Sequence, residues 1–323
     1  MKRLFWKFID FLRVLRTSWV LKDFYWGKQL AGSMSIDLKD VEVKRRTGNI
    51  YLAEVGLSLT KNKHLYIIDK HLYPVVKKIT IRLDGKWDYD KNGQLSIKFN
   101  DIIINVYDRT DIEVINDIFI MHMYAFYPLD TKIIVLDIGM NHGIASLYFA
   151  SKREVVKVIG YEPVPTTFHK ALANFNLNPD LSNKITPTNT GVGESNKSST
   201  LYYYPESSGQ SSIYATNLNR TVTENIQIEI LSATEILHDL ITHNPKYSIF
   251  VKIDCEGSEY EIIRSLVSNK IINKIHAMVM EWHTMNDHQN PCELIELLHK
   301  SGFIAFSFSF DTTGMIYAIN HNK

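Results

Sequence analysis

The sequence predicts an α/β fold, in which a mostly parallel sheet carries helices on both faces and ends in an antiparallel hairpin. From Ile133 onward, strand-like apolar runs alternate with helix-like segments, a pattern typical of a parallel sheet. Near the end of the chain, the strand-like segments Phe303–Phe310 and 315–320 are separated by only four residues. A crossover helix does not fit into so short a connection, so these two strands are expected to form a hairpin.

The first thirty residues predict an amphipathic helix rich in basic and aromatic side chains. They contain seven Lys and Arg residues against Asp10 and Asp23, and three of the chain's five tryptophans. Lys7, Asp10 and Arg13 interrupt the apolar run, which excludes a signal peptide or a membrane-spanning helix. Two interpretations stay open: an interfacial membrane helix with a basic rim, or a helix packed on the second domain or on a sister subunit. The second is preferred, because buried helix faces are commoner.

Residues 31–110 predict a smaller, β-rich accessory domain. Four segments have strand-like composition, at 49–59, 75–83, 94–99 and 102–107, and turn-forming residues separate the later ones. Such a domain can recognise an acceptor, mediate dimerisation or dock on a partner. The residues do not choose among these roles, so acceptor recognition and homo-oligomer formation both stay open.

Residues 111–323 predict the main domain. A helix is expected over 111–127 and ends before Pro128. An apolar strand follows and runs into Asp137-Ile138-Gly139-Met140-Asn141-His142-Gly143, a sharp strand-to-helix turn. Because glycine has no Cβ, a ligand can lie directly against the backbone of such a turn.

The position of Glu162 and the glycine pattern of the turn indicate which kind of ligand the turn binds. Glu162 follows nineteen residues after Gly143, at the end of a second apolar run, where a carboxylate can bind both hydroxyls of a ribose. The turn has a single Gly-x-x-x-Gly and lacks the Gly-x-Gly-x-x-Gly of dinucleotide sites, which disfavours a nicotinamide oxidoreductase. A nucleoside with a small zwitterionic tail fits better, and S-adenosylmethionine is the common ligand of that shape.

The later elements continue the same pattern. A helix is expected over 166–176, a third strand over 184–193, and two further strands over 248–253 and 277–283. Acidic residues and a histidine follow or end the last two strands.

Four motifs together resemble the FkbM family of S-adenosylmethionine-dependent methyltransferases. They are DIGMNHG at 137–143, EP at 162–163, KIDCEGSE at 252–259 and EWH at 281–283. The resemblance covers residues 111–323. It implies a Rossmann-like class I methyltransferase sheet and S-adenosylmethionine as the cofactor. It also implies O-methylation of a hydroxyl on a sugar, glycolipid or secondary metabolite, so the expected partner is a small-molecule or glycan acceptor.

Ligands of such sheets bind at the carboxyl ends of the strands. On that basis, and by resemblance, Asp137, Gly139, Asn141 and Gly143 are expected to contact the methionine part of the cofactor. Glu162 is expected to hold its ribose.

Four further residues are the candidate catalytic groups: Asp254, Glu256, Glu281 and His283. They fall at strand ends beyond the expected position of the sulfonium, so they can face the acceptor. His283 is the best candidate base, because an imidazole titrates near neutral pH, and the carboxylates can orient it or act as the base themselves if burial raises their pKa. The same set can bind a divalent metal such as Mg²⁺ or Mn²⁺, but no ligand spacing is diagnostic, so no metal site is predicted.

Composition excludes several classes of partner. A formal net charge of +1 over 323 residues gives no general attraction to nucleic acid. Only two cysteines occur, Cys255 and Cys292, without metal-type spacing, which fits a reducing, cytoplasmic compartment. Membrane association remains an expectation that depends on the N-terminal helix. The alternative of a different class is a non-catalytic S-adenosylmethionine-binding or regulatory protein with the same fold.

Overall fold

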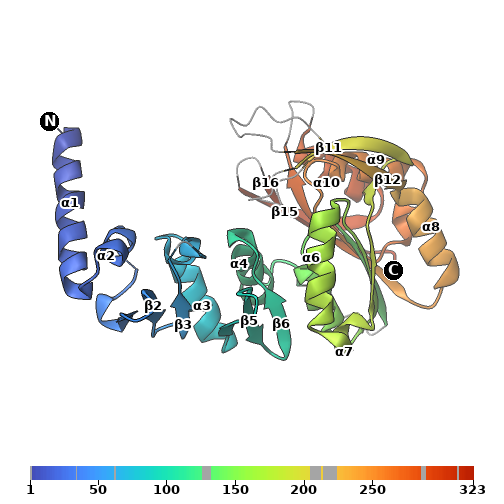
Figure 1. The fold of residues 1–323 in the computed structure, drawn as a ribbon. Helices are drawn as coiled ribbons and strands as arrows, with labels where there is room; N and C mark the ends of the chain where they lie inside the picture. The colour runs from blue at the N-terminus through green and yellow to red at the C-terminus, as the bar shows by residue number, and fades with distance from the viewer. Residues whose placement is uncertain are drawn as a thin grey trace. The chain divides into compact units, whose positions relative to one another are not determined.

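The chain forms two compact units, Met1–Met121 and His122–Lys323. The computed structural model describes residues 2–33, 35–61, 63–125, 132–203, 212–213, 224–284, 289–310 and 313–323. Figure 1 shows the order of the elements along the chain.

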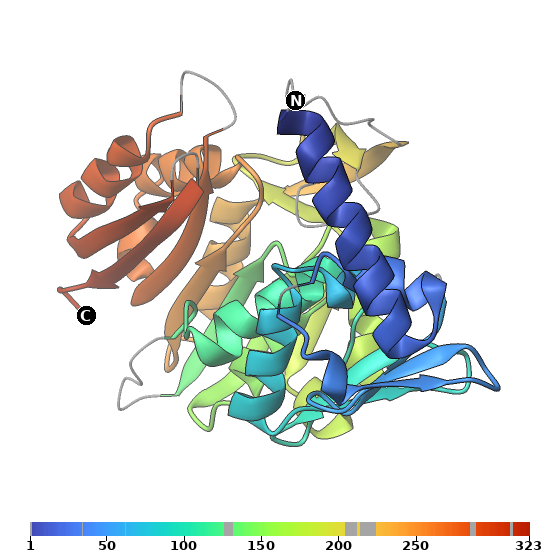
Figure 2. The same cartoon turned by 90° about the vertical axis from the view of Figure 1, so that its left-hand side faces the viewer.

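The first unit begins with two helices, α1 (Lys2–Leu21) and α2 (Phe24–Leu30). Helix α1 ends before Lys22, whose φ of +53° is incompatible with a continuing helix. Asp23 then caps α2, because its side chain accepts a hydrogen bond from the backbone N–H of Trp26 at 3.0 Å. The amphipathic helix expected over the first thirty residues is therefore two helices, of which α1 is the long dark blue helix in Figure 2.

Two small antiparallel sheets follow. The first contains β1 (Val41–Lys44), β2 (Asn49–Leu52) and β3 (Leu57–Leu59), and the second contains β4 (Lys86–Tyr89), β5 (Leu95–Phe99) and β6 (Ile102–Asn105). The helical elements are η1 (Leu38–Asp40), η2 (Leu65–Ile68), α3 (Tyr73–Leu83), α4 (Arg109–Ile115) and the π-helical turn η3 (Asn116–Ile120). The segment expected as one strand over 49–59 is thus two strands, β2 and β3, joined by a turn.

The prediction of a strand over 75–83 is wrong, because this segment lies in α3. Its β-branched residues suggested a strand, but Pro74 starts a helix, and Tyr73, Val76 and Ile79 are buried at helical spacing. Ile81, on another face of the helix, is 65% exposed. The helix expected over 111–127 begins at Arg109 as α4, continues as η3 and ends at Ile120, earlier than expected. Residues 121–125 are not helical, and Pro128 lies outside the described residues.

The second unit is built on a seven-stranded sheet with the order β15-β16-β14-β13-β7-β8-β9. Its strands are β7 (Ile133–Ile138), β8 (Val155–Tyr161), β9 (Ile185–Thr188), β13 (Ser248–Ile253), β14 (Ala277–His283), β15 (Phe303–Phe310) and β16 (Thr313–Asn320). The first five are parallel, whereas β16 is antiparallel to both β14 and β15. This arrangement confirms the predicted fold class and the terminal hairpin.

Helices cover both faces of this sheet. They are α5 (Ile144–Ala150), α6 (Pro165–Asn176), α7 (Pro179–Ser182), α8 (Ala233–His243), α9 (Glu259–Ser268), η5 (Ile272–Lys274) and α10 (Pro291–Lys300). Ile134, Leu136 and Ile138 of β7 belong to the core cluster that contains buried residues of α8, α9 and α10. Successive residues of a strand alternate between faces, and Asp137 accordingly meets Ser146 of α5 on the opposite face.

The third strand expected over 184–193 is two strands in two different sheets. β9 is an edge strand of the main sheet, which tolerates Pro187, whereas β10 (Gly191–Gly193) pairs with β12 (Glu224–Ser232). With β11 (Lys197–Tyr203) these form a three-stranded sheet of order β10-β12-β11, called here the small sheet. The side-chain amide of Asn189 donates to the carbonyl oxygens of Glu162 and Pro163 and fixes the turn between β9 and β10.

Candidate cofactor and acceptor site

A cleft opens at the carboxyl ends of β7, β8 and β13, as expected for a ligand site in a parallel sheet. Its volume is about 720 Å³, which includes space open to solvent. Polar lining comes from Gly139 and Asn141 of the turn after β7, from Glu162 and from the loop after β13. Apolar lining comes from the small sheet, through Val192, Leu201, Ile228 and Ile230.

Gly139 allows the turn after β7 to contact the end of β13. Its φ is +81°, and a Cβ built there would lie 1.7 Å from the carbonyl oxygen of Asp254. Only glycine fits at this position, because any side chain would collide with backbone. Gly143 has a different reason to be glycine, since a Cβ there would meet the ring of Phe175 at 2.6 Å. Gly143 is not among the residues that line the cleft, and its contact in this structure is with Phe175 of α6.

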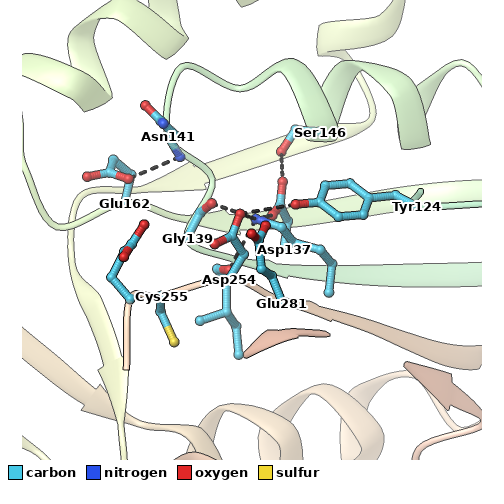
Figure 3. Close-up of polar contacts among 12 residues, drawn as sticks. Tyr124, Asp137, Gly139, Asn141, Ser146, Glu162, Asp254, Cys255 and Glu281 are labelled. Atoms are coloured by element: carbon cyan, nitrogen blue, oxygen red, sulfur yellow. Dashed lines mark hydrogen bonds and ion pairs between the residues drawn. The ribbon is translucent and has the colours of Figure 1, made fainter. Parts of the chain in front are cut away.

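Glu162 connects the end of β8 to the same turn. One carboxylate oxygen accepts a hydrogen bond from the backbone N–H of Asn141 at 3.0 Å, as Figure 3 shows, and the other accepts one from Val164 at 2.9 Å. Each oxygen keeps a second lone pair that a ribose hydroxyl can use. Burial raises the pKa of Glu162 to about 7, although these two hydrogen bonds oppose the rise.

Asp137 is fully buried beneath the turn and does not line the cleft. One oxygen accepts a hydrogen bond from Ser146 Oγ at 2.6 Å, and the other lies 3.2 Å from Nζ of Lys252. The direct contact with the methionine part expected from the sequence is therefore not what this geometry offers. Asp137 instead braces the turn from below.

Lys252 is the residue of this site whose role the sequence did not suggest. Its side chain is 2% exposed, and its Nζ donates to the carbonyl oxygen of Gly139 at 2.6 Å and lies 3.6 Å from Oδ2 of Asp254. Burial alone lowers the pKa of Lys252, but the carboxylates of Asp137 and Asp254 outweigh burial and raise it. The sequence does contain one indication of this role, because Lys252 is the one charged residue in the apolar run that forms β13.

Tyr124 approaches the same carboxylate from another segment, and Figure 3 shows its ring pointing toward Asp254. Its hydroxyl donates to Oδ2 of Asp254 at 3.0 Å, while the hydroxyl of Tyr317 on β16 donates to the carbonyl oxygen of Met123 and holds this segment. Burial, followed by the charge of Asp254, raises the pKa of Tyr124 well above its usual value. Asp254 is therefore fixed by a cation and a neutral phenol.

His283 lies among carboxylates on the acceptor side. Its Nδ1 is 3.1 Å from Glu259 Oε1, and its Nε2 is 3.7 Å from both Glu256 Oε1 and Glu281 Oε1. The structure thus brings together His283, Glu256 and Glu281, as predicted. It adds Glu259, whose two oxygens also accept hydrogen bonds from the backbone N–H groups of Cys255 and Gly257.

The charge state of His283 differs from the one expected. Burial lowers the pKa of an imidazole, but Glu256 and Glu259 outweigh it and raise the pKa of His283 to about 11. An imidazolium has no lone pair for a proton, so this geometry argues against His283 as the base. Glu281 suits that role better, because burial and then Asp254 raise its pKa to about 7. Burial also raises the pKa of Glu256 well above its usual value.

A metal must be weighed at the same cluster. One donor atom each from Asp254, Glu281 and His283 lies within 4.8 Å of the others, a spacing that a divalent cation can span. A metal would have to displace the proton from Nε2 of His283, because both ring nitrogens of an imidazolium are donors. In the structure His283 instead bonds Glu259 and faces Glu256 and Glu281, and no metal is assigned to the cluster.

Comparisons with known proteins agree with this geometry. The sequence profile of the methyltransferase FkbM domain matches residues 137–305. "Methyltransferase 1" of Beauveria bassiana (strain ARSEF 2860) is 27% identical over 191 residues, which cover 54% of this chain and 74% of that protein. "Methyltransferase sdnD" of Sordaria araneosa is 23% identical over 173 residues, which cover 46% of this chain and 66%, just under two thirds, of that protein.

Solved structures of methyltransferases are also similar, but distantly. Methyltransferase FkbM from Methylobacillus flagellatus KT gives a TM-score of 0.37 at 17% identity, over 60% of this chain and 45% of that chain. The human methyltransferase 10 domain containing protein gives 0.39 at 12% identity, over 76% and 93% of the two chains. Similarities this weak support no inference about substrates.

Proposed function

Because this chain belongs to the FkbM methyltransferase family, we propose that it transfers the methyl group of S-adenosylmethionine to a hydroxyl of a sugar, glycolipid or secondary metabolite. One observation carries the proposal. One cleft is lined both by Glu162, which is suited to a ribose, and by Asp254 and Glu256 of the polar loop after β13. A cofactor whose ribose is held by Glu162 would present its methyl group toward that loop.

The turn after β7, Glu162 and the small sheet would hold the cofactor. Gly139 and Asn141 line the cleft where the methionine part would lie against the backbone. Glu162 would accept hydrogen bonds from the two ribose hydroxyls. The apolar side chains of Leu201, Ile228 and Ile230 would cover the adenine, whose faces prefer an apolar surface. Asp137 would act indirectly, through the turn.

On the acceptor side, Glu281 would be the base. Glu281 does not itself line the cleft, but one of its carboxylate oxygens lies within 4.8 Å of a donor atom of Asp254, which does. Its side chain is 32% exposed, so an acceptor bound beside Asp254 can reach it, and its pKa of about 7 places it partly ionised at neutral pH. The acceptor oxygen attacks the methyl carbon, the carbon–sulfur bond breaks with its electron pair staying on sulfur, and the hydroxyl proton passes to Glu281. S-adenosylhomocysteine and the methyl ether are the products. His283 would remain an imidazolium that holds Glu256 and Glu281 in place.

Calorimetric titration tests this function first. The full chain is titrated with S-adenosylmethionine and separately with NAD, and the Glu162→Ala variant serves as the control. We expect micromolar binding of S-adenosylmethionine, a loss of at least about tenfold in the variant from the missing charged hydrogen bonds, and no binding of NAD.

Release of S-adenosylhomocysteine across a panel of hydroxylated acceptors is then measured. Turnover with any of them supports O-methylation. Retained cofactor binding with transfer only to nitrogen or carbon acceptors would overturn it, and cofactor binding with no transfer at all would identify a binding or regulatory protein. Failure to bind S-adenosylmethionine would reject the whole assignment of the cleft.

A further inference from the structure

Helix α1 carries a stripe of exposed apolar side chains that the proposed function does not use. Phe11, Leu12, Leu15 and Trp19 are 55%, 46%, 43% and 81% exposed. At 3.6 residues per turn they lie on one face over more than two turns of the helix. They are called here the α1 stripe.

The opposite face of α1 accounts for its packing in the first unit. Thr17 and Leu21 are buried on that face. Ser18 follows Phe11 by seven residues and so lies at the edge of the stripe, where it contacts α2 so closely that a Cβ on Gly27 would lie 2.0 Å from its Oγ. Packing on α2 therefore reaches the Phe11 edge of the stripe but leaves its four side chains exposed. The α1 stripe is left facing outward from the pair of helices.

Basic residues flank the α1 stripe. By helical position Lys7 lies beside one edge and Arg16 beside the other, and both are exposed. The first thirty residues contain seven Lys and Arg against two Asp, in a chain whose overall formal charge is only +1. Positive charge is thus concentrated in the first thirty residues, of which Lys7 and Arg16 flank the stripe, while Asp10 pairs with Arg13 at 3.5 Å.

An apolar stripe with basic residues at both edges favours a partner that is negatively charged at those edges. A second copy of α1 seated on the stripe would bring the basic rims of both copies together, and like charges at a seam are unfavourable. A bilayer surface with anionic headgroups offers the opposite charge at the rim and an apolar layer beneath it, where Trp and Phe side chains are favoured. Among the described residues, no helix is sufficiently long and apolar to cross a membrane, so the contact must be at the surface.

We propose that α1 docks on the surface of a bilayer containing anionic phospholipids, with the α1 stripe in the interface and Lys7 and Arg16 at the headgroups. The inference does not depend on methyl transfer. It favours the interfacial membrane helix over the packed helix that the sequence analysis preferred.

Vesicle co-sedimentation of the full chain tests the proposal. The vesicles contain phosphatidylcholine alone, or phosphatidylcholine with about one third phosphatidylglycerol, at low and high salt. We expect binding to the anionic vesicles, at least tenfold weaker binding to the neutral ones, and a marked loss at high salt because the charges are screened. Equal binding to both vesicle types, or none to the anionic ones, would overturn it.

Matched variants on one helix sharpen the test. Leu15→Ser and Val20→Ser remove side chains of similar exposure, 43% and 45%, but Val20 lies outside the stripe. We expect Leu15→Ser to weaken vesicle binding at least about fivefold and the matched Val20→Ser to change it less than twofold, while Leu15→Ser combined with Trp19→Ser should weaken it at least about tenfold. Equal losses would overturn the assignment of the face. Because these side chains are exposed, the melting temperature should not change, and circular dichroism checks this.

Sedimentation velocity without lipid tests the alternative that a second copy of α1 covers the stripe. A monomer for both wild type and the stripe variant agrees with docking on lipid. A wild-type dimer that dissociates in the Leu15→Ser, Trp19→Ser variant would overturn the proposal in favour of a second copy on the stripe.

Discussion

The ammonium nitrogen of Lys252 lies 3.2 Å from Oδ1 of Asp137, and the two side chains are 2% and 0% exposed. The pair joins the carboxyl end of β13 to the carboxyl end of β7, just before the cofactor turn. Lys252 also donates to the carbonyl oxygen of Gly139 inside that turn. Because a buried charge without its partner is costly, this pair holds the turn in one position relative to Asp254.

The variant Lys252→Met should destabilise the protein by about 3–5 kcal/mol, because it leaves Asp137 as an uncompensated buried charge. Adding Asp137→Asn should recover part of that loss, so that the double variant costs clearly less than the sum of the singles. Urea unfolding measures each free energy. Lys300→Met is the matched control, since the Lys300–Glu296 pair is exposed and should contribute roughly 0–1 kcal/mol. Strict additivity of the two buried changes would contradict the role given to the pair.

Cofactor affinity should depend on pH through Glu162. Its pKa of about 7 means that the carboxylate is largely protonated at pH 6 and largely ionised at pH 8. The ionised form accepts hydrogen bonds from ribose hydroxyls more strongly, so the affinity for S-adenosylmethionine should rise over this interval. Glu162→Gln should bind at least about tenfold more weakly at pH 8 and lose this rise. Calorimetry at several pH values decides the question, and an unchanged slope in the variant would assign the titration to another group.

Glu162 should also make the free energy of unfolding depend on pH when no ligand is bound. The pKa of Glu162 is raised from 4.5 to about 7, so between these values the native state holds a proton that the unfolded chain releases. This residue's contribution to the free energy of unfolding therefore falls as pH rises from about 4.5 to about 7. Denaturant titrations of wild type and Glu162→Gln should differ in this window, and parallel curves would contradict the buried carboxylate.

Turnover should follow the ionisation of Glu281. A base must be deprotonated to act, so kcat/KM should be low below pH 6 and rise through about pH 7. Glu281→Gln should lower kcat by about 10²–10⁴-fold, while the Kd for S-adenosylmethionine stays within a few-fold of wild type. Glu296→Gln, on the exposed side of α10, is the control and should leave both values unchanged. A full kcat in Glu281→Gln would move the role of base to Glu256.

Activity should persist in excess EDTA. The charged His283 already occupies the space between Glu256 and Glu281, and a metal at Asp254, Glu281 and His283 would require its proton to leave. Initial rates before and after EDTA, and again after Mg²⁺ or Mn²⁺ is added, give the answer. Loss with EDTA and recovery with either metal would establish a metal site and revise the protonation of His283.

Gly139→Ala should destabilise the protein by roughly 2–4 kcal/mol, because the new methyl group would collide with the backbone oxygen of Asp254 at a φ of +81°. Gly32→Ala is the matched control, since a Cβ there has no heavy atom within 4 Å. Thermal unfolding of both variants provides the comparison. Equal melting temperatures would show that the turn can move away from β13.

Much of the second unit could be predicted from the sequence because its determinants are local. β7 and β13 are buried along their whole length, so each is a short apolar run that is recognisable without knowing its neighbours. The terminal hairpin followed from the length of one connection. The first unit was harder, since the β-branched residues of α3 suggest a strand and only the burial of Tyr73, Val76 and Ile79 on one face explains the helix.

The sequence by itself determined the α/β class, the family and the positions where a cofactor turn and a ribose carboxylate occur, because each depends on residues close together along the chain. The tertiary structure decided which carboxylates are paired and which are protonated. Lys252 lies more than a hundred residues from Asp137 in the sequence. His283, at the end of β14, lies beside Glu256 of the loop after β13 and Glu259 at the start of α9. A pKa depends on charges a few ångströms away in space, so only the fold reveals that Glu256 and Glu259 raise the pKa of His283 and that burial and Asp254 raise the pKa of Glu281.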